Sequence, residues 1–382
     1  MLREETFHLS LTGENSHKVF IPRGQGSIAI GTKELSEGKY DVWLNDGEPI
    51  NWNAFNGLYT FHSQQNTEQY PYGDFPRWFY YSGNDKGFIE WSHKRYIERF
   101  TWFTYEDASI DLTQANIYTF SLHVNSGQIE LSIGRKTREL SLSGSIENIA
   151  IKKCDSLPGL NFTLRNGSDE AESYSLPTYK LLKQAPSVNV DVPPLGKPFD
   201  CKSLLQFTSL ESLHLHGSLI NLEALAELKN LKILALRYVP DLSGMPSLLS
   251  FPKLTSFIGY NIEETVGKTL KKEFKNSNIA QLRKKIWFTT EYGIPFDGWE
   301  AKNAKVATRA YKACLKEIKK AKNESEAREA IVTFVQVINT LPNIETIERE
   351  DAGTAVMQLV ESSALGISEE TGLEWFDEVR DF

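Results

Sequence analysis

Two histidines, His214 and His216, have the residue type and spacing in this chain that point most directly to a functional site. They alternate with Leu213 and Leu215. Side chains two residues apart in a β-strand point to the same face, so both imidazoles would lie opposite the leucines. Two imidazoles beside a carboxylate could ligate a metal ion, could contact a protein partner, or could simply face water. We favour contact with a protein partner and predict no metal site.

The familiar catalytic motifs are absent from the sequence. Gly267-Lys268-Thr269 imitates the end of a phosphate-binding P-loop, but Ile262 stands where the loop requires its first glycine. The chain has no H-E-x-x-H zinc motif and no G-x-S-x-G nucleophile motif. We therefore predict no catalytic residue and no cofactor, and lean against an enzyme. A catalytic site assembled from residues far apart in the sequence stays the alternative.

A second kind of site is suggested by the ring-dense segment from Tyr70 to Tyr105, which contains Trp78 and Trp91. Aromatic faces stack on sugar rings, so exposed tryptophans on a β-rich domain would suit a carbohydrate. Rings also bury large apolar areas and fill cores, and we expect most of these rings to be interior. Carbohydrate binding or processing through Trp78 and Trp91 is the alternative function.

The histidine pair lies inside a repeated pattern of leucines. The pattern L-x-x-L-x-L occurs with modest decay at Leu210-Leu213-Leu215, Leu231-Leu234-Leu236 and Leu254-Phe257-Gly259. The repeats are about 21 and 23 residues apart, which is the spacing of leucine-rich repeats. Residues 185–260 therefore resemble bacterial leucine-rich-repeat proteins, and residues 146–184 resemble them more loosely. The resemblance implies short parallel strands that stack with their leucines inside and their alternate residues on a concave face.

Aligning the repeats places polar residues of neighbouring strands side by side on that face. Asp191 falls beside His216 on one side, and Arg237 followed by Tyr260 falls on the other. An acid, an imidazole, a guanidinium and a phenol in one lateral row would suit the side chains of a protein. The predicted partner-binding residues are therefore Asp191, His214, His216, Arg237 and Tyr260.

Short alternating runs separated by turn residues fill residues 1–140, a pattern typical of strands with one buried face. The clearest pair of runs is Tyr118 to Val124 and Ile129 to Ile133. The turn Asn125-Ser126-Gly127 joins them, which predicts a β-hairpin. We expect an antiparallel β-sandwich-like domain in this region.

From residue 301 onward, apolar residues recur at helical spacing, and Asn323 followed by Glu326 resembles a capping box. This pattern predicts a small helical bundle. The predicted fold class is thus multidomain α+β, with an antiparallel β-sandwich-like domain, a short leucine-rich-repeat solenoid and a C-terminal helical bundle. The expected regions are a β-rich domain at 1–140, the solenoid with its C-terminal cap at 141–276, a connector at 277–300 and an acidic helical domain at 301–382.

The net charge and the cysteine content restrict which functions and which cellular compartment we expect. The net charge of −8 argues against general nucleic-acid binding, which requires a basic surface. Residues 341–382 hold eleven acidic and two basic residues, which we interpret as a solvated face, with steering of a basic partner as the alternative. We expect a cytoplasmic protein without membrane contact. The N-terminus lacks an apolar signal stretch, no run reaches membrane-spanning length, and Cys154, Cys201 and Cys314 form no C-x-x-C motif.

The C-terminal tail carries a second resemblance. Residues 344–351 and 375–382 resemble the helical tail of small bacterial immunity-type proteins, which neutralise toxins. That resemblance implies a cytoplasmic, non-enzymatic protein that binds one toxin tightly. The leading hypothesis is therefore a protein-binding protein, and its narrower form is an immunity protein whose partner is a toxin. We make no prediction of the oligomeric state.

Overall fold

The computed structural model describes residues 5–22, 25–31, 40–45, 47–58, 76–165, 172–296 and 298–382. It divides the chain into two compact units, Met1–Lys285 and Ile286–Phe382, which we call unit 1 and unit 2 and describe separately. Residues 70–75, the first part of the ring-dense segment, lie outside the described residues.

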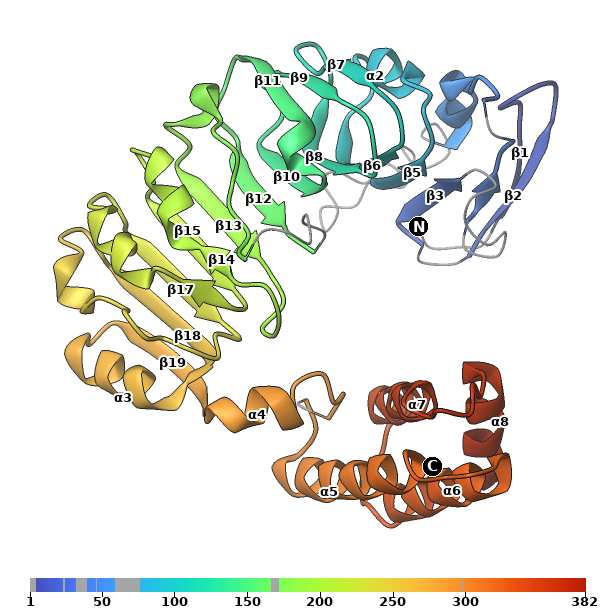
Figure 1. The fold of residues 1–382 in the computed structure, drawn as a ribbon. Coiled ribbons are helices and arrows are strands. Elements are labelled where there is room, and N and C mark those ends of the chain that lie inside the picture. Colours follow the sequence, from blue (N-terminus) through green and yellow to red (C-terminus); the bar gives the residue numbers. More distant parts are fainter. Residues whose placement is uncertain are drawn as a thin grey trace. The chain divides into compact units, whose positions relative to one another are not determined.

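A large parallel β-sheet, which we call the main sheet, dominates unit 1 (Figure 1). In the described residues it has twelve strands, in the order β19-β18-β17-β15-β13-β12-β10-β8-β6-β5-β3-β4. Every adjacent pair is parallel. The strands are β3 (Ser27–Gly31), β4 (Val42–Trp43), β5 (Trp78–Ser82), β6 (Ile97–Thr104), β8 (Ile117–Val124), β10 (Glu139–Gly144), β12 (Gly159–Thr163), β13 (Ser187–Asp191), β15 (Ser212–His216), β17 (Ile233–Arg237), β18 (Ser256–Glu263) and β19 (Ser277–Arg283). Together with its helices, the sheet makes an α/β-type fold.

Inward-facing apolar side chains line up from strand to strand in the main sheet. Matching positions of β6, β8, β10 and β12, twenty residues apart, hold Phe100, Phe120, Leu140 and Leu160. The same row continues in β13, β15, β17 and β18 with Val188, Leu213, Leu234 and Phe257. All of these side chains are buried, so one dry interior runs along the unit.

Between main-sheet strands, the chain returns along the other side of this interior. Three returns form short strands, β7 (Ala108–Asp111), β9 (Ile129–Ile133) and β11 (Ile149–Cys154), which pair in parallel as a second sheet (Figure 1). Later returns form 3-10 helices, η5 (Cys201–Gln206), η6 (Leu222–Glu227) and η7 (Leu248–Ser250). Leu204, Leu222 and Leu248 of these helices are buried, so the returns cover the core on the side opposite the main sheet.

The predicted antiparallel sandwich of residues 1–140 is wrong. The supposed hairpin strands do not pair, because β8 lies in the main sheet between β6 and β10 whereas β9 lies in the second sheet between β7 and β11. Gly127, with a φ of +87°, turns the chain from one sheet to the other, and a Cβ there would collide with the backbone of Glu106. In the described residues, antiparallel pairing is limited to β1 (Glu5–Leu9) and β2 (His17–Ile21).

The main sheet also runs across residue 140, where we expected one domain to end. That residue lies inside β10, and a single hydrophobic core extends from Leu9 to Ile279. The α+β expectation fails because a strand with one buried face alternates with period two in both parallel and antiparallel sheets. Parallel strands thus occupy the N-terminal region as well as the leucine repeats.

Rings from the ring-dense segment fill the N-terminal part of this core. Phe88 and Phe100 stack with ring centroids 4.0 Å apart. Trp52 meets Tyr81 edge-on at 5.4 Å, and the indole N–H of Trp102 donates to the carbonyl of Gly83 at 2.7 Å. These rings come from η2 (Trp52–Phe55), α2 (Gly87–Ser92) and two neighbouring main-sheet strands, β5 and β6. If one main-sheet strand with its return is called a coil, aromatic side chains fill much of the core of these N-terminal coils, where later coils use leucine.

Unit 1 also contains the 3-10 helices η3 (Ile146–Asn148) and η4 (Lys180–Leu182), a pair of short strands and a longer helix. The short strands β14 (Phe199–Asp200) and β16 (Leu219–Ile220) pair in parallel beside the main sheet. Helix α3 (Glu264–Glu273) follows β18 directly. The Glu263 carboxylate caps this helix by accepting from the backbone N–H groups of Thr265 and Val266, which explains why the chain turns helical there.

Unit 2 is helical and has a hydrophobic core of its own. Its helices are α4 (Lys285–Thr290), which begins at the unit boundary, α5 (Ala301–Ile318), α6 (Glu324–Asn339), α7 (Thr346–Glu361) and α8 (Glu369–Val379). Asn323 caps α6, because its side-chain oxygen accepts from the backbone N–H of Glu326 at 3.0 Å. None of the helices in the described part of the chain combines the length and apolar character that crossing a bilayer requires.

Candidate functional site

The open face of the main sheet brings the predicted partner-binding residues together. Backbone register places Asp191 opposite His216, His216 opposite Arg237, and Arg237 opposite Tyr260. We call these four residues the face row. His214 lies on the same face, two residues before His216 on β15. All five side chains therefore belong to one surface that four parallel strands hold in fixed order.

Asp191 is the most connected member of the face row. Its Oδ1 accepts from Nη2 of Arg165 at 2.9 Å and lies 3.1 Å from Nδ1 of His216. Partial burial by itself would raise the pKa of Asp191. The hydrogen bond from His216 and the charges of His216 and Arg165 outweigh that effect and lower the pKa. Asp191 is thus an ionised carboxylate whose charge is already shared by two partners.

His216 is oriented by two acceptors. Its Nδ1 lies 3.1 Å from the Asp191 carboxylate and 3.2 Å from the backbone carbonyl of Val192. Both partners are oxygen acceptors, so we assign the ring proton to Nδ1. The other ring nitrogen, Nε2, is then left as the atom with which His216 can meet a partner.

His214 belongs to a second polar row on the same face, two residues before the face row along the strands. Burial, followed by the charge of Arg237, lowers the pKa of His214, so this imidazole is neutral at physiological pH. Across the register it faces Asn189, whose amide donates to Asn161. The side-chain oxygen of Asn189 is buried and has no hydrogen-bond partner among the described residues. A donor from a ligand could satisfy that oxygen.

Arg237 differs from the other charged groups of the site. Its side chain is exposed, and within the described ranges it has no ion-pair partner. His216 and Tyr260 lie opposite it on the neighbouring strands, and the Tyr238 ring lies 5.0 Å from the His216 ring and 5.6 Å from the Tyr260 ring. The site therefore presents one available guanidinium beside three packed rings.

A shallow depression of about 310 Å³ lies over these strands. Its lining includes Asn161, Thr163, Asn189, Asp191, His214 and Arg237. Such a surface offers charged and hydrogen-bonding groups, including the imidazoles of His214 and His216, to a partner. In the described part of the chain, no three histidine, cysteine or acidic side chains converge as metal ligands.

The two tryptophans of the carbohydrate alternative lie in different environments. Trp78 stands on the open face of β5 and is 37% exposed, with the Arg77 guanidinium 5.3 Å from its ring centroid. Trp91 is buried in α2, and its indole N–H donates to the side-chain oxygen of Asn56 at 3.0 Å. Trp91 is therefore a core residue and does not share a binding surface with Trp78.

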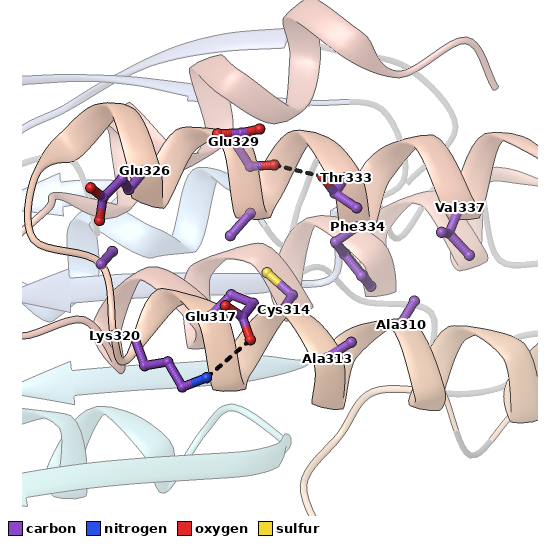
Figure 2. A pocket seen from close by; sticks show the side chains of 12 residues that line it. Ala310, Ala313, Cys314, Glu317, Lys320, Glu326, Glu329, Thr333, Phe334 and Val337 are labelled. Atoms are coloured by element: carbon purple, nitrogen blue, oxygen red, sulfur yellow. Dashed lines mark hydrogen bonds and ion pairs between the residues drawn. The ribbon is translucent and has the colours of Figure 1, made fainter.

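A larger hollow of about 480 Å³ lies between α5 and α6 in unit 2 (Figure 2). Small and apolar side chains such as Ala313 and Phe334 form its walls, with Glu326 and Glu329 beside them. Burial raises the pKa of the Cys314 thiol there to about 12, so the thiol stays protonated and is a poor nucleophile. We place the candidate site on the main sheet instead, because charged and aromatic groups converge there.

Arg165 and Tyr238 take part in the site although sequence reasoning missed them. Arg165 follows β12, where the leucine pattern is loose, so its place beside Asp191 could not be aligned. Tyr238 immediately follows Arg237, and plain strand alternation would have turned its ring to the opposite face. A φ of +52° brings the ring to His216 and Tyr260 instead.

Three comparisons with known proteins returned nothing: no family model, no curated protein and no solved structure matched the chain. The function must therefore be inferred from the geometry of the site. That geometry is a row of charged, imidazole and phenol side chains on an open sheet face.

Proposed function

We propose that this chain is a protein-binding protein that contacts its partner through the open face of the main sheet, from β13 to β18. The observation that carries the proposal is the face row, Asp191, His216, Arg237 and Tyr260, with Tyr238 packed between two of its rings. Arginine and tyrosine are enriched among the side chains that dominate binding energy at protein interfaces. Their concentration at one place supports a protein contact.

The rigidity of the site also supports binding. Hydrogen-bonded parallel strands fix the backbone beneath the row, and Asp191 restrains both His216 and Arg165. Side chains that are already ordered lose less conformational entropy when a partner arrives. A preorganised row of this kind favours tight and selective association.

The narrower proposal is a cytoplasmic immunity protein that neutralises a toxin by tight binding. The resemblance of residues 344–351 and 375–382 to immunity-type tails supports this form. The free thiols of Cys154, Cys201 and Cys314 support a reducing compartment, where unpaired cysteines are usual.

The proposal is tested by capturing the partner from the native host with the tagged full chain. We expect one protein to co-purify with the wild type and to be depleted in an Arg237→Glu variant. Arg99→Glu is the matched control, because Arg99 is an exposed arginine on β6 of the same sheet, outside the face row. Failure of the wild type to retain any specific protein, with neighbouring gene products supplied, would count against protein binding.

Carbohydrate binding is the second candidate, and one observation favours it. Trp78 and Tyr80 are each 37% exposed on β5, so two rings stand on the open face. A glycan array probed with the wild type and with Trp78→Ala tests this function. Binding that disappears in the variant would favour carbohydrate, and a blank array with the wild type would dismiss it. Trp91→Ala serves as a core control, because that ring is buried.

A further inference from the structure

Tyr238 has a backbone conformation that tyrosine rarely adopts. Its φ is +52°, in the left-handed region that disfavours side chains with a Cβ. The same position of the preceding coil holds Gly217 at φ +101°, and that of the following coil holds Asn261 at φ +50°. Glycine and asparagine are the residues that tolerate this region best. The middle coil carries a bulky ring where its neighbours carry residues suited to the turn.

The Tyr238 ring contacts both residues that flank Arg237 in the face row. It lies between the rings of His216 and Tyr260, with the Tyr238–Tyr260 pair edge-on at an interplanar angle of 74°. Strained residues that persist in a fold concentrate at functional sites. Tyr238 therefore marks this part of the row as the centre of contact.

The electrostatics of the row select the charge of the partner group. Asp191 is the acid of the row, and it is already engaged by Arg165 and His216. Arg237 is exposed and has no ion-pair partner among the residues that the structure describes. Its charge is one cause of the lowered pKa of His214, so it acts on the site from close by. A guanidinium of this kind pairs best with a carboxylate, which it can bind through two parallel hydrogen bonds.

We infer that the partner places an acidic side chain against Arg237, from a loop that also carries an apolar or aromatic residue to pack on the contacting rings of Tyr238 and Tyr260. This inference rests on the proposed protein-binding function and names the chemistry of the partner. The carboxylate of the partner supplies the negative charge that pairs with the Arg237 guanidinium. The neighbouring apolar group packs on the phenol rings, which exclude water from the ion pair and strengthen it.

The probe for this inference is a display library of short random peptides, selected against the full chain. We expect the enriched peptides to carry Asp or Glu next to an aromatic or aliphatic residue. Their affinity should fall at least about tenfold for Arg237→Ala and for Arg237→Glu, and should stay unchanged for the matched control Arg99→Glu. Absence of enrichment, enrichment of peptides without acids, or equal binding to Arg237→Glu would each overturn the inference.

Tyr238→Gly supplies a second measurement that separates a binding role from a structural one. Relief of the backbone strain should hold the melting temperature of unit 1 at or above that of the wild type, while affinity for the selected peptides falls. A clear drop in melting temperature, or unchanged affinity, would contradict the role of Tyr238.

A native partner that binds wild type and Arg237→Glu equally would refute the acidic contact and leave protein binding standing. Failure to capture any native partner would refute protein binding itself.

Discussion

At the scale of single residues, the site is built around a carboxylate that organises its neighbours. Asp191 holds His216 through Nδ1 and Arg165 through Nη2, so it fixes the groups on both sides of itself. The exposed fractions of Asp191 and Arg165 are 43% and 44%, which means that water screens their attraction. The value of this contact therefore lies mainly in orientation, with a small gain in stability.

Replacing Asp191 with Asn should destabilise unit 1 by less than about 1 kcal/mol near neutral pH. The folded-state pKa of Asp191 is lower than its usual value, because His216 and Arg165 outweigh partial burial. The wild-type advantage is therefore complete above the ordinary aspartate pKa of about 4 and is lost as pH falls through the lower folded value. Urea unfolding of both proteins across the acid range measures it. A wild-type advantage that grows with acidity would contradict this account, and Glu14→Gln on an exposed turn is the control.

The residues of the face row follow from the sequence because repeat alignment fixes which side chains are lateral neighbours. Asp191, His216, Arg237 and Tyr260 could be placed in order from their offsets to the leucines. Tyr238 could not, because its position depends on a left-handed backbone conformation that the strand pattern does not encode. The alternation of buried and exposed residues describes extended strands alone. Tyr238 joins the site at a position where the backbone is not extended.

At the scale of elements, stacked parallel coils carry both the core and the site. Inner residues such as Phe120 form the buried row, and their neighbours such as Ser121 face outward. The strand positions in the N-terminal region were predictable from this alternation, whereas their partners were not. The turn at Gly127 looks like a hairpin turn in sequence because both a hairpin and a coil corner need a residue that tolerates positive φ. Aromatic residues in place of leucines hid the repeat upstream of residue 146.

The stacked-coil arrangement makes a stability prediction for its inner row. Phe120→Ala should destabilise unit 1 by about 3–5 kcal/mol, because Phe120 is fully buried between Phe100 and Leu140 and its removal leaves a cavity. Ser121→Ala, the adjacent outward position, should change stability by less than about 0.5 kcal/mol. Chemical denaturation of both variants decides the matter. Similar effects at the two positions would mean that the alternation of buried and open faces is wrong.

At the scale of the whole molecule, two separate hydrophobic cores define two units. The core of unit 1 reaches Ile279, and the core of unit 2 begins at Phe296. Composition and helical spacing were enough to predict a helical C-terminal region. The boundary at Lys285 lies within residues 277–300, which we expected to be a connector, and composition alone does not place it more closely. At the other expected boundary, residue 140, the main sheet is continuous, because that residue lies inside β10.

Separate cores predict separate unfolding. Phe120→Ala should lower one thermal transition, and Ile331→Ala in α6, where the side chain is fully buried, should lower another. Each variant should leave the other transition within experimental error, because neither side chain contributes to the second core. Differential scanning calorimetry provides the readout. A single transition that both variants shift together would show that the units unfold as one.

The claim that the open face of the main sheet binds a protein is tested most directly by photo-crosslinking in the native host. A photoreactive phenylalanine analogue placed at Tyr260, in the face row, should form one adduct with a partner protein. That adduct should disappear when Arg237→Glu is added. The same analogue at Leu249, which is 71% exposed on η7, is the control and should form none. No adduct from position 260, or the same adducts from both positions, would contradict the account.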